Sequence, residues 1–163
     1  MNGPLNLKSW NPEGLSLLIG YNTSGKTSCL RRTSFPDLGL EFSTSRPFRL
    51  DIFSEETKYL TKVCDDFSCG RLKGRTFYMD NFGISLDPRN TRHFLSSLER
   101  SIEDPEYNLI ISTHSLAAIA WFDRRYDDVY VTKFGNVFPL LDLHNEDWLM
   151  QRCLSSIYSQ GML

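Results

Sequence analysis

Short apolar runs alternate with amphipathic stretches along most of the 163-residue chain. Residues 15–19, 75–80 and 108–112 are rich in apolar side chains and have the length of buried strands. Between these runs, apolar residues recur at helical spacing, and polar or charged residues occupy the opposite face. We expect helices to begin near Ser28 and to cover residues 54–63, 88–102, 116–122 and 145–158. Strands that alternate with helices predict an α/β fold with a mainly parallel sheet.

The remaining segments are less regular. Residues 38–42 and 48–53 alternate enough to suggest two short strands, and residues 128–133 and 137–141 predict a hairpin around Phe134-Gly135-Asn136. In the lead-in, Trp10 either packs at the edge of the core or stacks on a nucleotide base. Neither an internal repeat nor a linker interrupts the pattern, so residues 1–163 are expected to form a single domain.

One glycine-rich loop lies between the first expected strand and the first expected helix. Residues 20–27 read GYNTSGKT and match the pattern G-x-x-x-x-G-K-[ST] at every fixed position. Strand, loop and helix in this order predict a phosphate-binding loop, although a polar surface turn can have a similar composition. Lys26 would reach the β- and γ-phosphates of a nucleotide, and the Thr27 hydroxyl would bind Mg²⁺. The expected nucleotide-binding residues are Gly20, Asn22, Thr23, Ser24, Gly25, Lys26, Thr27 and Ser28.

The strand at residues 75–80 ends in a carboxylate, Asp80. Phosphate-loop proteins hold Mg²⁺ with such an acid at the carboxyl end of a strand. Asp80 could also simply end the strand before the turn that follows. Together with the phosphate loop, it predicts a second metal-binding residue opposite Thr27.

Two further segments resemble parts of ABC-type ATPases. Residues 80–88, DNFGISLDP, resemble the Walker B and D-loop segment of that family, and residues 110–115, IISTHS, resemble its switch-histidine strand. Asn22 in the phosphate loop (Walker A) is typical of the chromosome-maintenance, recombination and OLD-like branches. The resemblance extends over about residues 15–131 and implies a small AAA/ABC-type P-loop ATPase that uses ATP and Mg²⁺. It further implies that His114 senses the γ-phosphate, although a histidine at a strand end is otherwise usually a satisfied polar residue.

The sequence departs from the ABC pattern at the catalytic position. Asn81 stands where active members carry a glutamate. An amide cannot accept a proton, and losing a general base typically costs about 10²–10⁴-fold in rate. Hydrolysis is therefore expected to be slow or absent, unless Glu55, Glu56 or Asp87 substitutes.

Two other family motifs are reduced or missing. Gln151 and Gln160 are the only glutamines, and both lie too far downstream for a Q-loop. The signature motif is reduced at best to Phe67-Ser68-Cys69-Gly70, which reads equally well as part of a basic loop.

Composition restricts the partners only loosely. The net charge is −2, and the basic residues form no aromatic-basic stripe, so nucleic acid is left open as a partner. Four cysteines show no C-x-x-C pair, and no apolar run is long enough to cross a bilayer. We expect a cytoplasmic protein without membrane contact. An apolar stripe in the tail, with Leu149, Cys153, Leu154 and Ile157, fits either a partner surface or the domain's own core.

These features predict an ATP-binding subunit that acts as a dimerisation switch, as a homodimer or an ABC-type heterodimer. It would control a separate effector, such as a nuclease or toxin, in DNA repair or anti-phage defence. The alternative is an active ATP hydrolase that remodels DNA or a partner. A scaffold that binds no nucleotide, or a small-molecule kinase, fits the motifs less well.

Overall fold

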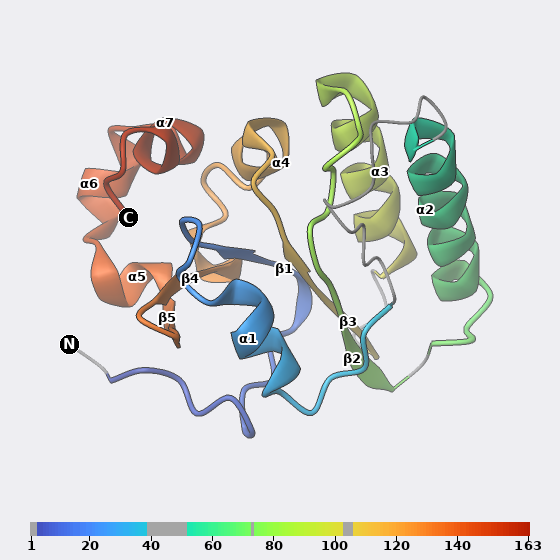
Figure 1. Ribbon diagram of the computed structural model, residues 1–163, viewed down its shortest axis with the longest axis horizontal. Helices are drawn as coiled ribbons and strands as arrows, with labels where there is room; N and C mark the ends of the chain where they lie inside the picture. Colours follow the sequence, from blue (N-terminus) through green and yellow to red (C-terminus); the bar gives the residue numbers. More distant parts are fainter. Residues whose placement is uncertain (1–2, 39–51, 73, 103–105) are drawn as a thin grey trace.

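The computed structural model describes residues 3–38, 52–72, 74–102 and 106–163, and for residues 52–54 it describes the backbone alone. Five strands form one sheet with helices on both faces (Figure 1). The strands are β1 (Gly14–Ile19), β2 (Arg75–Met79), β3 (Tyr107–Ser112), β4 (Val129–Lys133) and β5 (Asn136–Pro139). The helices are α1 (Lys26–Arg31), α2 (Ile52–Ser68), α3 (Pro88–Ser101), α4 (Leu116–Trp121), α5 (Leu140–Leu143), α6 (Glu146–Met150) and α7 (Leu154–Ser159), with a 3-10 turn at Tyr126–Asp128.

The strand order is β2-β3-β1-β4-β5. β2, β3, β1 and β4 run parallel, and β5 returns antiparallel to β4. In the centre, Leu17 pairs with Ile111 of β3 on one side and with Val129 of β4 on the other. Because the four parallel strands end at the same edge, the loops that follow them meet there. The predicted α/β fold with a mainly parallel sheet is confirmed.

Alternate residues of the strands face two separate hydrophobic clusters. Leu17 and Ile111 belong to the cluster that packs against α2, α3, α4 and α7, whereas Leu18 and Ile110 face α1 and the lead-in segment. Burying each such side chain contributes roughly 1.5–3 kcal/mol to folding. Trp10 packs in the second cluster, with its ring 4.9 Å from that of Tyr130. Trp10 is therefore a buried packing residue.

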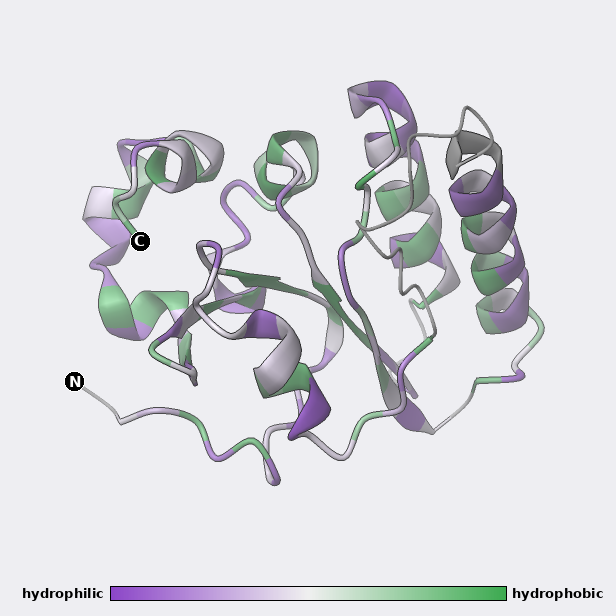
Figure 2. Cartoon of the chain, in the orientation of Figure 1, coloured by the Kyte–Doolittle hydropathy of each residue, from purple (hydrophilic) through white to green (hydrophobic). Residues whose placement is uncertain are grey.

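A row of helices covers the face of the sheet that carries Leu17 and Ile111. α2 packs beside α3, α3 beside α4, and α4 beside α7 (Figure 1). α2 and α3 carry both hydrophobic and hydrophilic residues, as the alternating colours in Figure 2 show. The start of α3 is determined locally, because the Asp87 carboxylate accepts hydrogen bonds from the backbone N–H groups of Arg89 and Asn90. These N–H groups lower the pKa of Asp87.

The predicted single helix over residues 145–158 was wrong. Two short helices, α6 and α7, form there instead, with a break at residues 151–153, and α5 precedes them at residues 140–143, where the end of the second hairpin strand was expected. Asn145 caps α6 by accepting a hydrogen bond from Asp147, and the backbone N–H at Leu154, where α7 begins, lies 3.3 Å from the Asp123 carboxylate. Leu154 and Ile157 are buried in the core. The tail's apolar stripe therefore packs mainly onto this chain's own core, although Cys153 is exposed.

Other boundaries shift by a few residues. α1 begins at Lys26 rather than near Ser28, and α2 extends from residue 52 to residue 68. Ile52 and Phe53 begin α2, so the end of the strand expected over residues 48–53 was wrong. At the other expected strand, Leu38 lies outside the strands, although Asp37 forms an isolated bridge with Tyr78. The rest of both expected strands lies outside the described residues. None of the helices in the described part of the chain is long and apolar enough to span a membrane.

Candidate functional site

The phosphate loop connects β1 directly to α1 at the centre of the sheet edge. Its backbone turns through two left-handed residues, Thr23 (φ 70°) and Gly25 (φ 89°). The Cys29 N–H donates to the Gly25 carbonyl oxygen at 2.8 Å, the first hydrogen bond of α1. The N–H groups of residues 25–28 therefore have no acceptor within the helix. Such N–H groups attract anions.

A threonine of β4 supports the loop from the side. The Thr132 and Ser24 hydroxyl oxygens lie 2.6 Å apart, and Thr132 also donates to the Ile19 carbonyl oxygen at 3.3 Å. Gly20 lies so close that a Cβ atom there would come within 2.1 Å of Thr132 Oγ1. Gly20 is thus required for close packing. Sequence reasoning missed Thr132, whose only signal is a hydroxyl side chain in an apolar strand.

Lys26 folds back into its own loop. Its Nζ donates to the Gly20 carbonyl oxygen at 2.6 Å and lies 3.4 Å from that of Tyr21. The side chain is buried, and burial lowers the pKa of Lys26 to about 8, with the negative charge of Asp80 opposing the shift. Within the described part of the chain, Nζ hydrogen-bonds to backbone carbonyl oxygens, and a bound phosphate would add an anion in direct contact with it.

Thr27 and Asp80 meet as the sequence predicts. The Thr27 hydroxyl donates to Asp80 Oδ2 at 2.5 Å. The other oxygen, Oδ1, accepts from the Ser112 hydroxyl and lies 3.1 Å from the Asn81 N–H. A hydroxyl and a carboxylate side by side are the oxygen ligands that Mg²⁺ prefers. The donor set therefore fits a magnesium ion shared between the loop and the end of β2.

Asn81 follows Asp80 in a tight turn. Its φ is 57°, a left-handed conformation that asparagine adopts more readily than most residues. Its N–H also lies 3.0 Å from the Ser112 hydroxyl, so the turn is tied to the end of β3. The asparagine thus has a conformational reason to be there, besides lacking the basicity of a glutamate. Its side chain is partly exposed.

Two of the three candidate substitute acids are engaged elsewhere. Glu56 of α2 is fully buried, and its carboxylate accepts from the Gly83 N–H and the Ser85 N–H, each at 2.9 Å, and from the Ser85 hydroxyl. Asp87 caps α3. Glu55 is exposed in the first turn of α2. Glu56 therefore holds the loop after β2, a role that sequence reasoning missed.

His114 follows β3 at the same edge. Its Nδ1 lies 2.6 Å from the Tyr158 hydroxyl of α7. Partial burial of the imidazole lowers the pKa of His114, the positive charge of Lys26 lowers it further, and Asp80 opposes both. These effects favour the neutral imidazole, and Lys26 and Asp80 are close enough to act on it. Sequence reasoning missed Tyr158 because only the packing of the tail brings it here.

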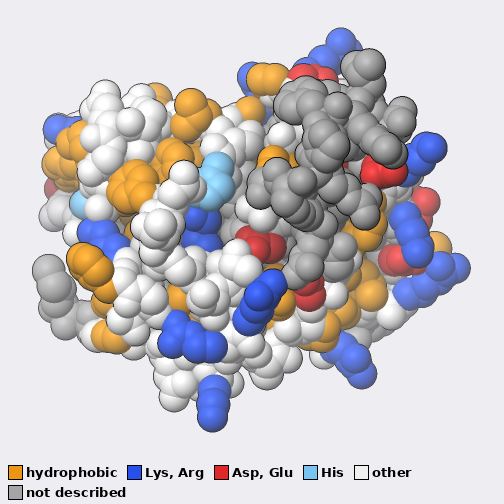
Figure 3. Space-filling model, viewed as in Figure 1, with side chains coloured by type: hydrophobic (Ala, Val, Ile, Leu, Met, Phe, Trp, Pro, Cys, Tyr) orange, Lys and Arg blue, Asp and Glu red, His pale blue; other side chains and the backbone are white. Residues whose placement is uncertain are grey.

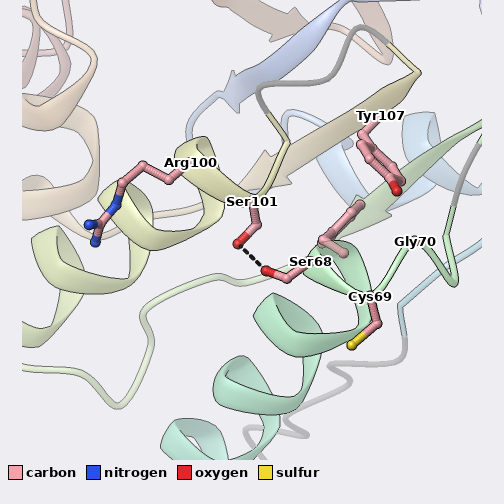
Figure 4. A pocket seen from close by; sticks show the side chains of 7 residues that line it. Ser68, Cys69, Gly70, Arg100, Ser101 and Tyr107 are labelled. Atoms are coloured by element: carbon pink, nitrogen blue, oxygen red, sulfur yellow. Dashed lines mark hydrogen bonds between the residues drawn. The ribbon is translucent and has the colours of Figure 1, made fainter.

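The reduced signature lies elsewhere. Ser68 ends α2, Gly70 follows it, and both line an open hollow of about 530 Å³ with Arg100, Ser101 and Tyr107. Figure 4 shows Ser68 pointing toward Ser101 across this hollow, with their hydroxyl oxygens 3.3 Å apart. Tyr107 begins β3, so the hollow lies at the sheet edge opposite the phosphate loop. Because the hollow and the phosphate loop lie at opposite edges of the sheet, this position does not favour Ser68 and Gly70 as an ABC signature motif.

Surface charge gives no clear interface. On the face in Figure 3, basic side chains occur in several separate groups, and acidic side chains lie among those on the right. Arg71 pairs with Asp66 at 2.9 Å, and the Arg32 guanidinium donates to the Gly135 carbonyl oxygen. This distribution of surface charge neither supports nor excludes nucleic acid as a partner.

Comparison with known proteins gives a likeness at the level of the fold. No protein-family model matches the chain, and no curated protein matches it. A solved structure described as "Structure of ATP binding subunit of ABC transporter" superposes with a TM-score of 0.51 at 14% sequence identity. The match covers 91% of this chain and 88% of that chain. The chain has a P-loop NTPase-like fold, with a five-stranded, mostly parallel sheet between helices.

Proposed function

We propose that this chain is an ATP-binding, ABC-type ATPase subunit that acts as a nucleotide-dependent dimerisation switch for a separate effector. The observation that carries the proposal is the contact between Thr27 and Asp80, 2.5 Å long, beside a buried Lys26 in a complete phosphate loop. A solved ABC transporter subunit with a similar fold is named for ATP binding, which agrees with this choice of ligand.

Each residue of the loop has a distinct part in binding. The N–H groups of residues 25–28 would hold phosphate oxygens, and Lys26 would exchange its bond to Gly20 for one to the phosphates. Thr27 and Asp80 would hold the magnesium ion, with Ser112 and Asn81 orienting the carboxylate. The magnesium ion, when bound, neutralises charge on the phosphates.

We expect weak hydrolysis for two reasons. The residue after Asp80 is an amide, and Glu56 and Asp87 are occupied with backbone N–H groups. A bound, slowly hydrolysed nucleotide suits a switch, because differential affinity for two assembly states is what moves an equilibrium. A role in DNA repair or anti-phage defence, with a nuclease or toxin as effector, follows from the sequence resemblance.

An active hydrolase is the second candidate, and the position of His114 after β3, within reach of the charges of Lys26 and Asp80, favours it. Burial lowers the pKa of the imidazole from its usual value, which favours the neutral form that can accept a proton. In that case ATP would turn over and the energy would remodel DNA or a partner.

Calorimetric titration with ATP and Mg²⁺ tests the proposal. The wild type should bind, Lys26→Ala should lose binding, and the control Lys8→Ala, exposed in the lead-in, should retain it. Bound nucleotide at 100 times its Kd should stabilise the fold by about 2.7 kcal/mol. Light scattering should detect a dimer when ATP is present and no dimer when ATP is absent. If ATP does not bind, the proposal fails.

Phosphate release separates the two candidates. Brisk release that Asp80→Ala abolishes favours the hydrolase. Release near background, together with ATP-dependent dimerisation, favours the switch.

A further inference from the structure

The turn between β4 and β5 presents an aromatic side chain to solvent. Phe134 is 98% exposed, the highest value among the large exposed hydrophobic residues. Its φ is 50° and that of Gly135 is 72°, so the turn needs two left-handed residues. Asn and Gly are the usual residues at such positions, and a phenylalanine there is strained. Neither folding nor solubility explains this side chain, and strain of this kind clusters at functional sites.

The turn is fastened to the phosphate loop. The Gly135 N–H donates to the Ser24 carbonyl oxygen at 3.2 Å. The Gly135 carbonyl oxygen accepts from the Arg32 guanidinium and from Cys29 Sγ at 3.4 Å. A Cβ atom on Gly25 would lie 3.3 Å from Gly135 Cα, so the two backbones touch. These contacts hold the backbone of the turn, and with it the Cα of Phe134, beside the loop.

The strand order places Phe134 at the correct end of a nucleotide. Asp80 and His114 follow β2 and β3, which lie on one side of β1, whereas Phe134 follows β4 on the other side. Thr27 contacts Asp80, so the metal and the γ-phosphate belong on the β3 side. The nucleoside of the same molecule then extends toward the β4 side, where Phe134 lies. Trp10, the other aromatic considered for a base, is buried in the core.

We propose that Phe134 is the platform on which the base of the bound nucleotide stacks. This inference rests on the proposed function, since it requires phosphates in the loop. Stacking on an aromatic ring uses the π-face that every base has, so it gives affinity with little selection between adenine and guanine. ATP and GTP should therefore bind with affinities within about tenfold of each other.

Comparing ATP with inorganic tripolyphosphate isolates the base. Both ligands present three phosphates to the loop, but only ATP reaches Phe134. Phe134→Ala should weaken Mg²⁺·ATP binding by roughly 5- to 100-fold and leave Mg²⁺·tripolyphosphate binding within about twofold. Phe134→Trp should retain ATP affinity. Met150→Ala, which removes another exposed hydrophobic side chain on α6, should change neither.

The other outcomes are distinguishable. If Phe134→Ala leaves ATP affinity unchanged, or weakens both ligands equally, the stacking inference is overturned while phosphate binding stands. If the wild type binds neither ligand, the proposed function itself fails and the inference falls with it.

Stability supplies an independent readout. Asparagine tolerates the left-handed conformation better than phenylalanine, so Phe134→Asn should raise Tm by about 2–4 °C while lowering ATP affinity. A higher Tm together with a weaker ATP affinity is expected when the replaced residue serves binding at the expense of stability. A fall in Tm together with unchanged affinity would overturn the inference.

Discussion

The hydroxyl of Tyr158 lies 2.6 Å from Nδ1 of His114, which joins the last helix of the chain to the residue after β3. The same hydroxyl lies 3.5 Å from the Gly20 carbonyl oxygen, the acceptor for Lys26. The Tyr158 ring also stacks on Tyr21, with centroids 5.4 Å apart. The tail thus contacts both the phosphate loop and His114, so the charge of Lys26 in the loop should change the pKa of His114.

Replacing Lys26 with methionine should raise the pKa of His114. Partial burial and the positive charge of Lys26 both lower this pKa, and the substitution removes the second cause. An NMR titration of the imidazole C–H signals measures the change. Lys8→Met, in the exposed lead-in, should leave the signal where it is, and an unchanged His114 pKa in Lys26→Met would show that the two groups do not interact.

Lys26 should make stability and binding respond oppositely to alkaline pH. Its pKa is about 8 in the folded protein and 10.5 as a model value. Between these values the unfolded chain binds more protons, so the contribution of Lys26 to the free energy of unfolding rises with pH. ATP affinity should fall over the same range, because neutral Lys26 no longer attracts phosphate. Urea unfolding and calorimetry from pH 7 to 10 provide both curves.

Comparing the wild type with Lys26→Met isolates the contribution of Lys26 to the pH dependence of stability from that of other groups that lose a proton at alkaline pH. In the variant, the part of the stability rise that Lys26 contributes should be missing. Equal slopes in both proteins would contradict the assigned pKa.

Removing the Glu56 carboxylate should unfold the loop after β2 more easily. Glu56→Ala leaves the buried N–H groups of Gly83 and Ser85 without an acceptor, at about 1–3 kcal/mol for each. Urea denaturation should show a loss of roughly 3 kcal/mol. Glu55→Ala, one residue earlier and exposed, should stay within about 0.5 kcal/mol. Similar losses in both variants would argue against the buried role.

Asn81 tests conformation and chemistry separately. Asn81→Glu should cost about 1 kcal/mol of stability, because a glutamate is strained at a φ of 57°. Under the switch proposal it should also raise ATP hydrolysis, by up to about 10²–10⁴-fold if the new carboxylate reaches the attacking water. Asn81→Gly keeps the turn and adds no base, so it should leave hydrolysis low. Fast wild-type hydrolysis that Asn81→Glu does not increase would favour the alternative.

Gly20→Ala should disrupt the phosphate loop. The added Cβ would lie 2.1 Å from Thr132 Oγ1 and 2.4 Å from Ser24 Oγ, so one strand or the loop must shift. Thermal unfolding should detect a loss of about 1–3 kcal/mol, and calorimetry a loss of ATP affinity. The control is Gly3→Ala, where a Cβ meets nothing within 4 Å. Full stability and binding in Gly20→Ala would mean that the loop is looser than its contacts imply.

Local patterns were enough to predict the framework of the site. Apolar alternation and the GYNTSGKT loop depend on residues close together in the chain, and the structure has β1, the loop and α1 in that order. Asp80 was predicted from the pattern of phosphate-loop proteins, which hold Mg²⁺ with an acid at the carboxyl end of a strand, and the structure brings it within 2.5 Å of Thr27. The two residues are 53 positions apart, and the strand order β2-β3-β1 decides that they meet.

The remaining contacts needed the folded chain. Thr132 supports Ser24 from 108 positions away, and Tyr158 approaches Gly20 from 138 positions away. Periodicity reports which face of an element is buried, but it does not say which other element covers that face. The sequence by itself predicted the parallel strands β1 to β4, the glycine-rich loop after β1 and the acid after β2. The tertiary structure decided that the tail breaks into short helices and brings Tyr158 to His114, that Glu56 is buried, and that Phe134 lies beside the loop, because strand order and packing set these contacts.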